Sequence, residues 1–336
     1  MKNKIILISG ILLLLLCSCQ KNPRYETDNF FAMDTFVTVK AESQSNETQI
    51  LKNKINQIEN VFSKTLPDSD ISKINNGSAS VVSDECSQIL NALFEISSII
   101  DGKFNPCMEP IVSLWDITGK KYIPTDEEIE NILSFCSPDS FKVSQNTITK
   151  NYPEAKLDVG ASIKGYAAQK AIDNIKNAGI KNAMVNIGGN IAVCGHSESH
   201  SDMWRVGITN PFKPDSIAGY IDCTDTVISV SGDYERYFEK DGVIYHHIFD
   251  PETGKPVNND IKSVAVISPN GLVSDTLSTA LFVMGKDKAL EFYHNSNFDF
   301  EAIIFTKDKN VYLTDELSSS FVILEESTLK IMQKSE

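Results

Sequence analysis

The sequence predicts an α+β fold in which a largely antiparallel sheet forms the core and helices flank it. Segments with helical spacing of apolar residues and short β-rich segments follow each other without a regular β-α-β rhythm. Of the 336 residues, 41% are hydrophobic and 23% are charged, which is ordinary for a globular protein with a sizeable core. No internal repeat or clear linker divides the chain, so we expect a single domain over residues 30–330.

The N-terminus has the pattern of a bacterial lipoprotein signal. Two lysines precede an apolar run over residues 5–16, which is too short to span a bilayer as a helix. Cys19 follows a small residue, as a lipid-modified cysteine does, so we expect a signal peptide over residues 1–18 and lipid attachment at Cys19. An ordinary cleaved signal is the alternative. Residues 19–29 are polar and predict a tether between membrane and domain.

The domain is predicted to begin with a strand over residues 33–40, where apolar and polar residues alternate. Helical spacing then marks two helices, one through Leu51, Ile55, Ile58 and Phe62 and one through Ile89, Leu93, Ile96 and Ile100. Two further helices are predicted over about 162–177 and about 274–284, each followed by a glycine. The β-rich segments are 183–187, 203–208, 226–231, 243–248, 262–267 and 301–306.

The charge balance restricts what the protein binds. A net charge of −14 argues against a general nucleic-acid surface, and an anionic ligand needs local cations, helix N-termini or a metal ion. Beyond the signal, the cysteines are odd in number and form no CxxC pair, so neither a zinc site nor a disulfide framework is expected. Buried single thiols are the expectation.

The segment 158–165 combines a carboxylate, a flexible turn and a lysine at a predicted helix start. Backbone N–H groups at that start can face an anion, and the Lys164 ammonium can reach a phosphate. The alternative is that Asp158 caps the helix and Lys164 lies exposed.

Gly188 and Gly189 interrupt a β-rich run. They match no nucleotide-binding fingerprint. Glycines at such a place permit close approach of a ligand or form a bulge, and the structural interpretation is favoured.

Asp275 and Thr279 are four residues apart, so they lie on one face of a predicted helix. A carboxylate and a hydroxyl at this spacing offer two hard oxygens, which suit Mg²⁺. The alternative is helix capping, which is common for such residues near a helix start.

His246 and His247 end a β-rich segment, and in a strand their rings point to opposite faces. Only one of them can then serve a site as an acid or base near neutral pH.

These segments resemble, in the same order, the motifs of the ApbE family, the FAD:protein FMN transferases. The resemblance extends from about residue 31 to residue 289. It rests on Ala32-Met33-Asp34-Thr35, Phe62-Ser63 with Pro67-Asp68-Ser69-Asp70, Asp101-Gly102-Lys103-Phe104-Asn105-Pro106, residues 157–166, Gly188-Gly189-Asn190, residues 229–236, residues 247–256 and Ser274-Asp275 onward.

The resemblance implies an FAD pocket in an ApbE-like fold. It implies contacts with the flavin nucleotide from Met33, Thr65, Lys103, Phe104, Asn105, Asp158, Lys164 and Phe249. It places Mg²⁺ on the Ala161 backbone carbonyl and the side chains of Asp275 and Thr279, with Ser278 where some members carry a second aspartate. Asp275 and His247 are the implied catalytic residues, and His247 would accept the proton of the target hydroxyl.

The implied reaction is attack of a protein Ser or Thr hydroxyl on the pyrophosphate of FAD, with Mg²⁺ balancing the charge. FMN then becomes attached to the protein, and AMP is released. Thr65 stands where many members carry tyrosine, and a smaller side chain there favours attack by water, which would make the chain an FAD pyrophosphatase. A flavin-binding or flavin-trafficking lipoprotein without turnover is the other alternative.

The resemblance also implies partners, namely flavin-accepting subunits of membrane redox complexes of the Rnf type or the Na⁺-translocating NADH:quinone reductase type. Together with the predicted signal, this suggests an exported, lipid-anchored protein on the periplasmic face of the inner membrane.

Overall fold

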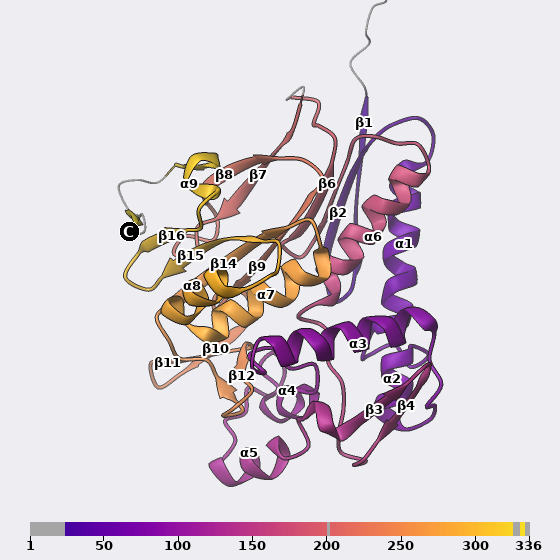
Figure 1. Ribbon diagram of the computed structural model, residues 1–336, viewed down its shortest axis with the longest axis vertical. Helices are drawn as coiled ribbons and strands as arrows, with labels where there is room; N and C mark the ends of the chain where they lie inside the picture. The colour runs from indigo at the N-terminus through magenta and orange to yellow at the C-terminus, as the bar shows by residue number, and fades with distance from the viewer. Residues whose placement is uncertain (1–23, 200–201, 325–329, 333–336) are drawn as a thin grey trace, which may run out of the picture.

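A nine-stranded sheet runs through the computed structural model, which describes residues 24–199 and 202–324 and the backbone of residues 330–332 (Figure 1). Neighbouring strands pair antiparallel except for β16 and β18, which are parallel. In spatial order the strands are β1 (Tyr25–Ala32), β2 (Thr35–Glu42), β5 (Ala183–Ile187), β6 (Asn190–Cys194), β9 (Thr226–Gly232), β14 (Ile261–Ser268), β15 (Glu301–Thr306), β16 (Asn310–Leu313) and β18 (Lys330–Met332). The predicted α+β fold with a largely antiparallel sheet is confirmed.

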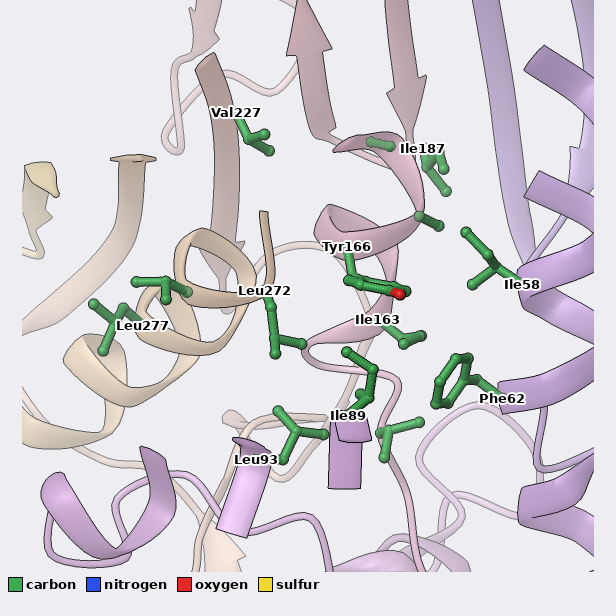
Figure 2. Packing of buried hydrophobic residues seen from close by; sticks show 14 of the residues in the cluster. Ile58, Phe62, Ile89, Leu93, Ile163, Tyr166, Ile187, Val227, Leu272 and Leu277 are labelled. Carbon is green, nitrogen blue, oxygen red and sulfur yellow. The ribbon is translucent and has the colours of Figure 1, made fainter. Parts of the chain in front are cut away.

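Helices cover one face of this sheet (Figure 1). They are α1 (Glu47–Phe62), α6 (Ile163–Asn177), α7 (Gly271–Met284) and α8 (Lys286–Asn295). The predicted apolar stripe of α1 is fully buried. Figure 2 shows Tyr166 of α6 between Phe62 of α1 and Leu272 of α7, and the rings of Phe62 and Tyr166 meet edge to face at 6.1 Å. The central helix α6 is therefore fixed from both sides.

A second, three-stranded sheet packs on the other face. Its order is β17 (Phe321–Ile323), β8 (Ile217–Cys223) and β7 (Trp204–Thr209), and the short helix α9 (Leu317–Ser320) precedes β17. Trp204, Ile208 and Phe321 pack there against Ile228 and Ile303 of the large sheet. Because both faces are covered, central strands such as β14 are buried on both sides and show no clear alternation of apolar and polar residues.

The remaining elements gather at one end of the large sheet (Figure 1). They are α2 (Asp70–Asn76), α3 (Asp84–Ile99), α4 (Glu109–Trp115), α5 (Asp126–Leu133), the 3₁₀ helix η1 (Pro138–Ser140) and the hairpins β3–β4 (Phe141–Ser144, Thr147–Lys150), β10–β11 (Tyr237–Lys240, Val243–His246) and β12–β13 (Phe249–Asp250, Lys255–Pro256). A separate apolar cluster around Trp115 joins α4 and α5 to β12. The predicted stripe from Ile89 to Ile100 is buried on α3 and its cap.

Several boundaries differ from the prediction. The tether expected over residues 19–29 is shorter, because residues 25–29 form the first part of β1, whose polar side chains are exposed at the sheet edge. The strand expected over 33–40 starts at Thr35, after a turn at Met33 and Asp34. The strand expected over 243–248 ends at His246. Cys19 and the signal peptide lie outside the described residues, and no described helix is long and apolar enough to cross a membrane.

Two glycines allow α6 and α7 to approach each other at their N-terminal ends. A Cβ atom on Gly165 would lie 2.4 Å from the Gly271 carbonyl oxygen, and one on Gly271 would lie 2.2 Å from the Gly165 carbonyl oxygen. Both obstacles are backbone atoms, so neither can move aside cheaply. The close approach brings residue 275 of α7 next to the start of α6.

We predict that Gly165→Ala lowers the free energy of unfolding by about 1–3 kcal/mol, because the added methyl forces α6 and α7 apart in a packed core. Urea unfolding of the full chain measures this. Asn174→Ala, at an exposed position of the same helix, is the matched control and should change stability by less than about 0.5 kcal/mol. Equal stability of Gly165→Ala and the wild type would contradict the tight contact.

Candidate active site

A cavity of about 910 Å³ opens where the α6 start, α7, the base of the β10–β11 hairpin and two turns of the large sheet meet. This volume is near the upper end of the range for small-molecule sites, about 300–1,000 Å³. Eleven of the residues implied by the sequence line it: Met33, Lys103, Phe104, Asn105, Asp158, Ala161, Lys164, His247, Phe249, Asp275 and Thr279. The structure therefore brings together side chains that are up to 246 positions apart, from Met33 to Thr279.

Two implied residues are not in the lining of the cavity. Thr65 is exposed, and its hydroxyl is 3.0 Å from that of Ser63. Ser278 is fully buried, and its hydroxyl donates to the Asp275 backbone carbonyl and contacts the Ser231 hydroxyl at 2.8 Å. Its buried position comes from the helical register, which turns residue 278 toward β9 while residues 275 and 279 face the cavity.

Asp275 is held by the start of α6. Its Oδ2 atom accepts a hydrogen bond of 2.9 Å from the Gly165 backbone N–H, one of the N–H groups that a helix leaves without a partner in its first turn. The carboxyl is 3% exposed. Burial raises the pKa of Asp275, and Lys164 with the nearby N–H groups only partly offsets this. Asp275 thus occupies N–H groups that the sequence suggested would face an anion.

The alternative that Asp275 caps its own helix is wrong. The α7 helix begins at Gly271, and the Asn270 side chain caps it by accepting from the N–H groups of Leu272 and Val273. Asp275 therefore lies inside the helix and does not cap it.

Three oxygens in the cavity suit a hard cation. Ala161, Asp275 and Thr279 all line it, and they offer a backbone carbonyl, a carboxylate and a hydroxyl. The Thr279 hydroxyl is 3.2 Å from that of Ser231. Within the described ranges, no group of three or more His, Cys, Asp or Glu residues is placed to hold a metal ion. The donor set fits Mg²⁺, which takes few protein oxygens and completes its shell with water and phosphate, but not a zinc centre.

Two cations in the cavity have no carboxylate partner among the described residues. The Lys164 ammonium donates to the Gly160 carbonyl oxygen, and the Arg236 guanidinium donates to that of Asp34 at 3.2 Å. Both groups retain donors for an anionic ligand, and Arg236 has the planar form that binds phosphate oxygens in pairs. These cations supply the local positive charge that an acidic protein needs at an anion site.

Asp158 is paired with Lys64 rather than placed as a helix cap. Lys64 Nζ is 2.6 Å from Asp158 Oδ2, and Asp158 Oδ1 accepts from the Gly160 N–H at 2.8 Å. Burial raises the pKa of Asp158, but Lys64 and the Gly160 N–H lower it by more, so the net pKa lies below its usual value. Asp158 is a fixed negative charge that anchors the turn leading to Lys164.

Only one of the two adjacent histidines faces the cavity. His246 is buried, with Nε2 2.9 Å from the Val257 carbonyl oxygen and Nδ1 accepting from the Ile248 N–H. His247 lines the cavity, and its Nδ1 is 3.3 Å from the Arg236 carbonyl oxygen. Because a carbonyl can only accept, this hydrogen bond puts the proton on Nδ1 and leaves the Nε2 lone pair available as a base.

The surroundings keep His247 neutral. Burial, then Arg236, His246 and Lys164, lower its pKa to about 3. A bound anion would raise this pKa, because negative charge stabilises the imidazolium. His247 is therefore unprotonated at neutral pH, and it becomes a stronger base when an anionic ligand is present.

An aromatic wall closes another side of the cavity. Phe249 is 7% exposed and its ring lies 5.9 Å from that of Trp115, whose indole N–H donates to the Gly254 carbonyl oxygen. Lys103 pairs with Glu252 at 2.8 Å, and the Asn105 amide donates to the Cys136 carbonyl oxygen. Lys103 and Asn105 line the cavity, yet their polar ends are engaged within this loop region.

Two tight hairpin turns form the remaining wall. Met33 and Asp34 have φ values of 53° and 57°, and Gly188 and Gly189 have 55° and 89°, as in two-residue type I′ turns. The Met33 N–H donates to Glu59 at 2.7 Å, which holds this strained turn in place. A Cβ on Gly188 would lie 2.5 Å from the Thr35 hydroxyl oxygen, so glycine lets the two turns touch. Gly188 thus has a structural role in this contact, and both glycines also line the cavity, where the backbone can approach a ligand.

The ApbE family model matches residues 33–304 of this chain, which is most of its length. The chain belongs to the ApbE family.

Named relatives of this ApbE family member agree with that match. The FAD:protein FMN transferase of Vibrio cholerae is 29% identical over 322 residues, which cover 92% of this chain and 95% of the relative. That of Treponema pallidum is 33% identical over 258 residues, 70% of each chain. Among solved structures, the ApbE protein of Thermotoga maritima has a TM-score of 0.80 at 29% identity and covers 88% of this chain. The flavin transferase ApbE of Vibrio cholerae has a TM-score of 0.79 at 25% identity and covers 89% of this chain and 99% of its own.

Glu235 and Arg236 of this family member line the cavity without having been assigned a role from the sequence. They follow β9 in the segment 229–236, which is one of the segments that resemble the family motifs. The resemblance gave them no function. Although water reaches Glu235 through the cavity, the surrounding protein raises the pKa of its carboxyl to about 7, against the lowering effect of Lys164 and Arg236. A carboxyl that is partly protonated near pH 7 repels an anionic ligand less.

We predict that His247 makes the protein less stable in acid. Its folded-state pKa of about 3 lies below its unfolded value near 6.5, so the unfolded chain takes up a proton first as the pH falls through 6.5. His247→Asn should therefore lose about 2 kcal/mol less unfolding free energy than the wild type between pH 7 and pH 5, measured with urea. The control is His294→Asn at an exposed position of α8. Identical losses in the wild type and His247→Asn would show that His247 is not held neutral.

Proposed function

We propose that this chain transfers FMN from FAD to a Ser or Thr hydroxyl of another protein and releases AMP. The relatives that match most of the chain are named FAD:protein FMN transferases. The observation that carries the proposal is the meeting, in one cavity, of a neutral histidine, three hard oxygens and two cations that form no ion pair within the described part of the chain. A hydroxyl nucleophile, a doubly anionic pyrophosphate and a divalent cation need these groups.

The residues of the cavity have separate roles in binding FAD and in accepting the proton. Lys164 and Arg236 bind and orient the phosphate oxygens, because both line the cavity and neither forms an ion pair with a carboxylate of the described residues. The aromatic wall at Phe249 offers an apolar face for a flavin ring. His247 Nε2 accepts the proton of the attacking hydroxyl, and the bond from Nδ1 to the Arg236 carbonyl keeps the ring in the required tautomer.

The cation proposed for this site is Mg²⁺, held by the Ala161 carbonyl, Asp275 and Thr279. Bound there, it neutralises charge on the pyrophosphate as phosphorus is attacked. Asp275 supports this role because it is the one acidic side chain of the three and its position is fixed by the Gly165 N–H. Ser278 is not included, since its hydroxyl is used inside the fold.

The structure gives no reason to favour FAD hydrolysis over transfer. The hypothesis of water attack rests on Thr65 being smaller than the aromatic residue of many family members; Thr65 is exposed and outside the cavity lining, so this hypothesis stays a prediction, which AMP release from FAD without an acceptor tests. Flavin binding without turnover is disfavoured as well, because it needs neither a base nor a cation site beside the phosphate-binding groups.

We propose flavin-accepting subunits of Rnf-type or Na⁺-translocating NADH:quinone reductase complexes as partners. The family resemblance supports them, as does the predicted lipoprotein signal. This signal, with Cys19 as the lipidated residue, also supports a lipid-anchored location on the periplasmic face of the inner membrane. Mass spectrometry of such a subunit after incubation with the enzyme, FAD and Mg²⁺ tests the assignment by the mass of an FMN adduct.

We predict that Asp275→Asn reduces the rate of Mg²⁺-dependent adduct formation by about 100-fold or more, because a neutral amide holds the cation weakly. Flavin fluorescence should show that FAD still binds. Adduct mass and AMP release in the same reaction are the measurements.

Ser278→Ala is the matched control, one helical position away from Thr279. It should leave the Mg²⁺ concentration for half-maximal rate within about threefold of the wild type, because Ser278 is turned away from the cavity. A tenfold rise in that concentration would show that Ser278 is a metal ligand, and full activity of Asp275→Asn would show that Asp275 is not.

A further inference from the structure

An exposed aromatic pair lies on the β1–β2 hairpin, whose turn lines the cavity, and it has no role in the steps above. Phe31 of β1 and Phe36 of β2 are 65% and 82% exposed, the two highest values among the described aromatic residues. They are directly opposite in the hairpin register, and their rings meet edge to face at 5.8 Å. Neither residue is part of the cavity lining. Two phenylalanines that contact each other and are exposed to solvent are typical of a binding surface rather than of the protein core.

The hairpin turn places this pair next to the reaction site. Met33, Asp34 and Thr35 line the cavity, so Phe36 follows a lining residue directly and Phe31 is two residues from Met33. Two extended residues span about 7 Å. The strand β1 forms the edge of the large sheet, so no further strand of the described chain covers this side of the hairpin. The turn itself is fixed by the Glu59 contact and by Gly188, so the pair is presented on a rigid support.

Transfer of FMN to a protein requires that the acceptor contacts the surface around the cavity. The acceptor hydroxyl has to enter the cavity, and the residues that flank it in the acceptor must then lie against the surface around the opening. Phe31 and Phe36 are one or two residues from residues that line the cavity. An apolar side chain at a similar spacing from the acceptor Ser or Thr, along the acceptor chain, can therefore contact the aromatic pair. Burial of such a side chain against two rings stabilises the complex without using the phosphate-binding groups.

We propose that Phe31 and Phe36 form the docking site for the acceptor protein, and that they bind an apolar side chain two to four residues from the modified Ser or Thr. This inference rests on the proposed transferase function and adds the surface that recognises the acceptor. It separates two tasks, since the cavity binds FAD and the aromatic pair selects the protein.

The test compares two measurements on the full-length enzyme. FAD affinity, from flavin fluorescence, reports the cavity. The kcat/KM for FMN adduct formation on a purified flavin-accepting subunit of a Na⁺-translocating NADH:quinone reductase, by mass spectrometry, reports docking. Phe31→Ala/Phe36→Ala should keep FAD affinity within twofold and lower kcat/KM for the acceptor at least tenfold, mainly through KM. Phe31→Leu/Phe36→Leu, which keeps an apolar surface, should lose less than the alanine variant.

The matched control is Val322→Ala/Leu324→Ala, which removes two side chains that are 42% and 52% exposed in and just after β17. It should leave both measurements unchanged. Equal kcat/KM in the wild type and Phe31→Ala/Phe36→Ala would overturn the docking site. Loss of binding to phosphatidylglycerol vesicles alone would also overturn it, since the pair would then contact the membrane. A fall in FAD affinity in parallel with kcat/KM would overturn it as well. A wild-type enzyme that binds FAD but modifies no acceptor would instead contradict the proposed function itself.

Discussion

The hydrogen bond between the Asp275 carboxylate and the Gly165 N–H is the contact on which the site depends. It joins the start of α6 to the second turn of α7, and it forms only because two glycines let the helices touch there. A buried carboxylate without such a donor would be protonated or displaced. The same contact fixes where the carboxylate lies relative to Ala161 before α6 and Thr279 on α7. Packing of the core and placement of the proposed cation site are therefore one structural feature.

The charge distribution follows from this arrangement. Asp275 occupies N–H groups at the start of α6, so the helix end is less available to a phosphate than a bare N-terminus would be. Lys164 and Arg236, which have no carboxylate partner in the described chain, supply positive charge instead. Asp158 is neutralised by Lys64, and the raised pKa of Glu235 reduces its negative charge. An acidic protein can thus bind a doubly anionic pyrophosphate without a broadly basic surface.

Much of this arrangement was predictable from the sequence, and the exceptions have physical reasons. Helical spacing located α1 and α3 because their buried faces are apolar, and the order of the motifs located most of the cavity lining. The start of α7 was missed by three residues because Asn270, a favoured N-cap residue, stands between Pro269 and Gly271, and this sequence is also typical of a turn. Thr65 and Ser278 lie outside the cavity lining, and the motifs did not reveal this because a position in a motif does not show which way a side chain points. The position of Arg236 depends on its contact with the turn at Asp34, which is distant in sequence, and local patterns do not contain this information. The Phe31–Phe36 contact follows from the register of a single hairpin, and it was missed because the prediction did not include the first strand of that hairpin.

The most direct measurement of the central claim is the affinity of the full-length enzyme for FAD with and without Mg²⁺, by isothermal titration calorimetry. If Asp275 and Thr279 hold a cation that also binds the pyrophosphate, FAD and Mg²⁺ must strengthen each other's binding. We expect FAD to bind at least about tenfold more tightly in millimolar Mg²⁺ than in EDTA, a coupling of about 1.4 kcal/mol. The same FAD dissociation constant in both buffers would contradict the claim that this site joins cation and pyrophosphate.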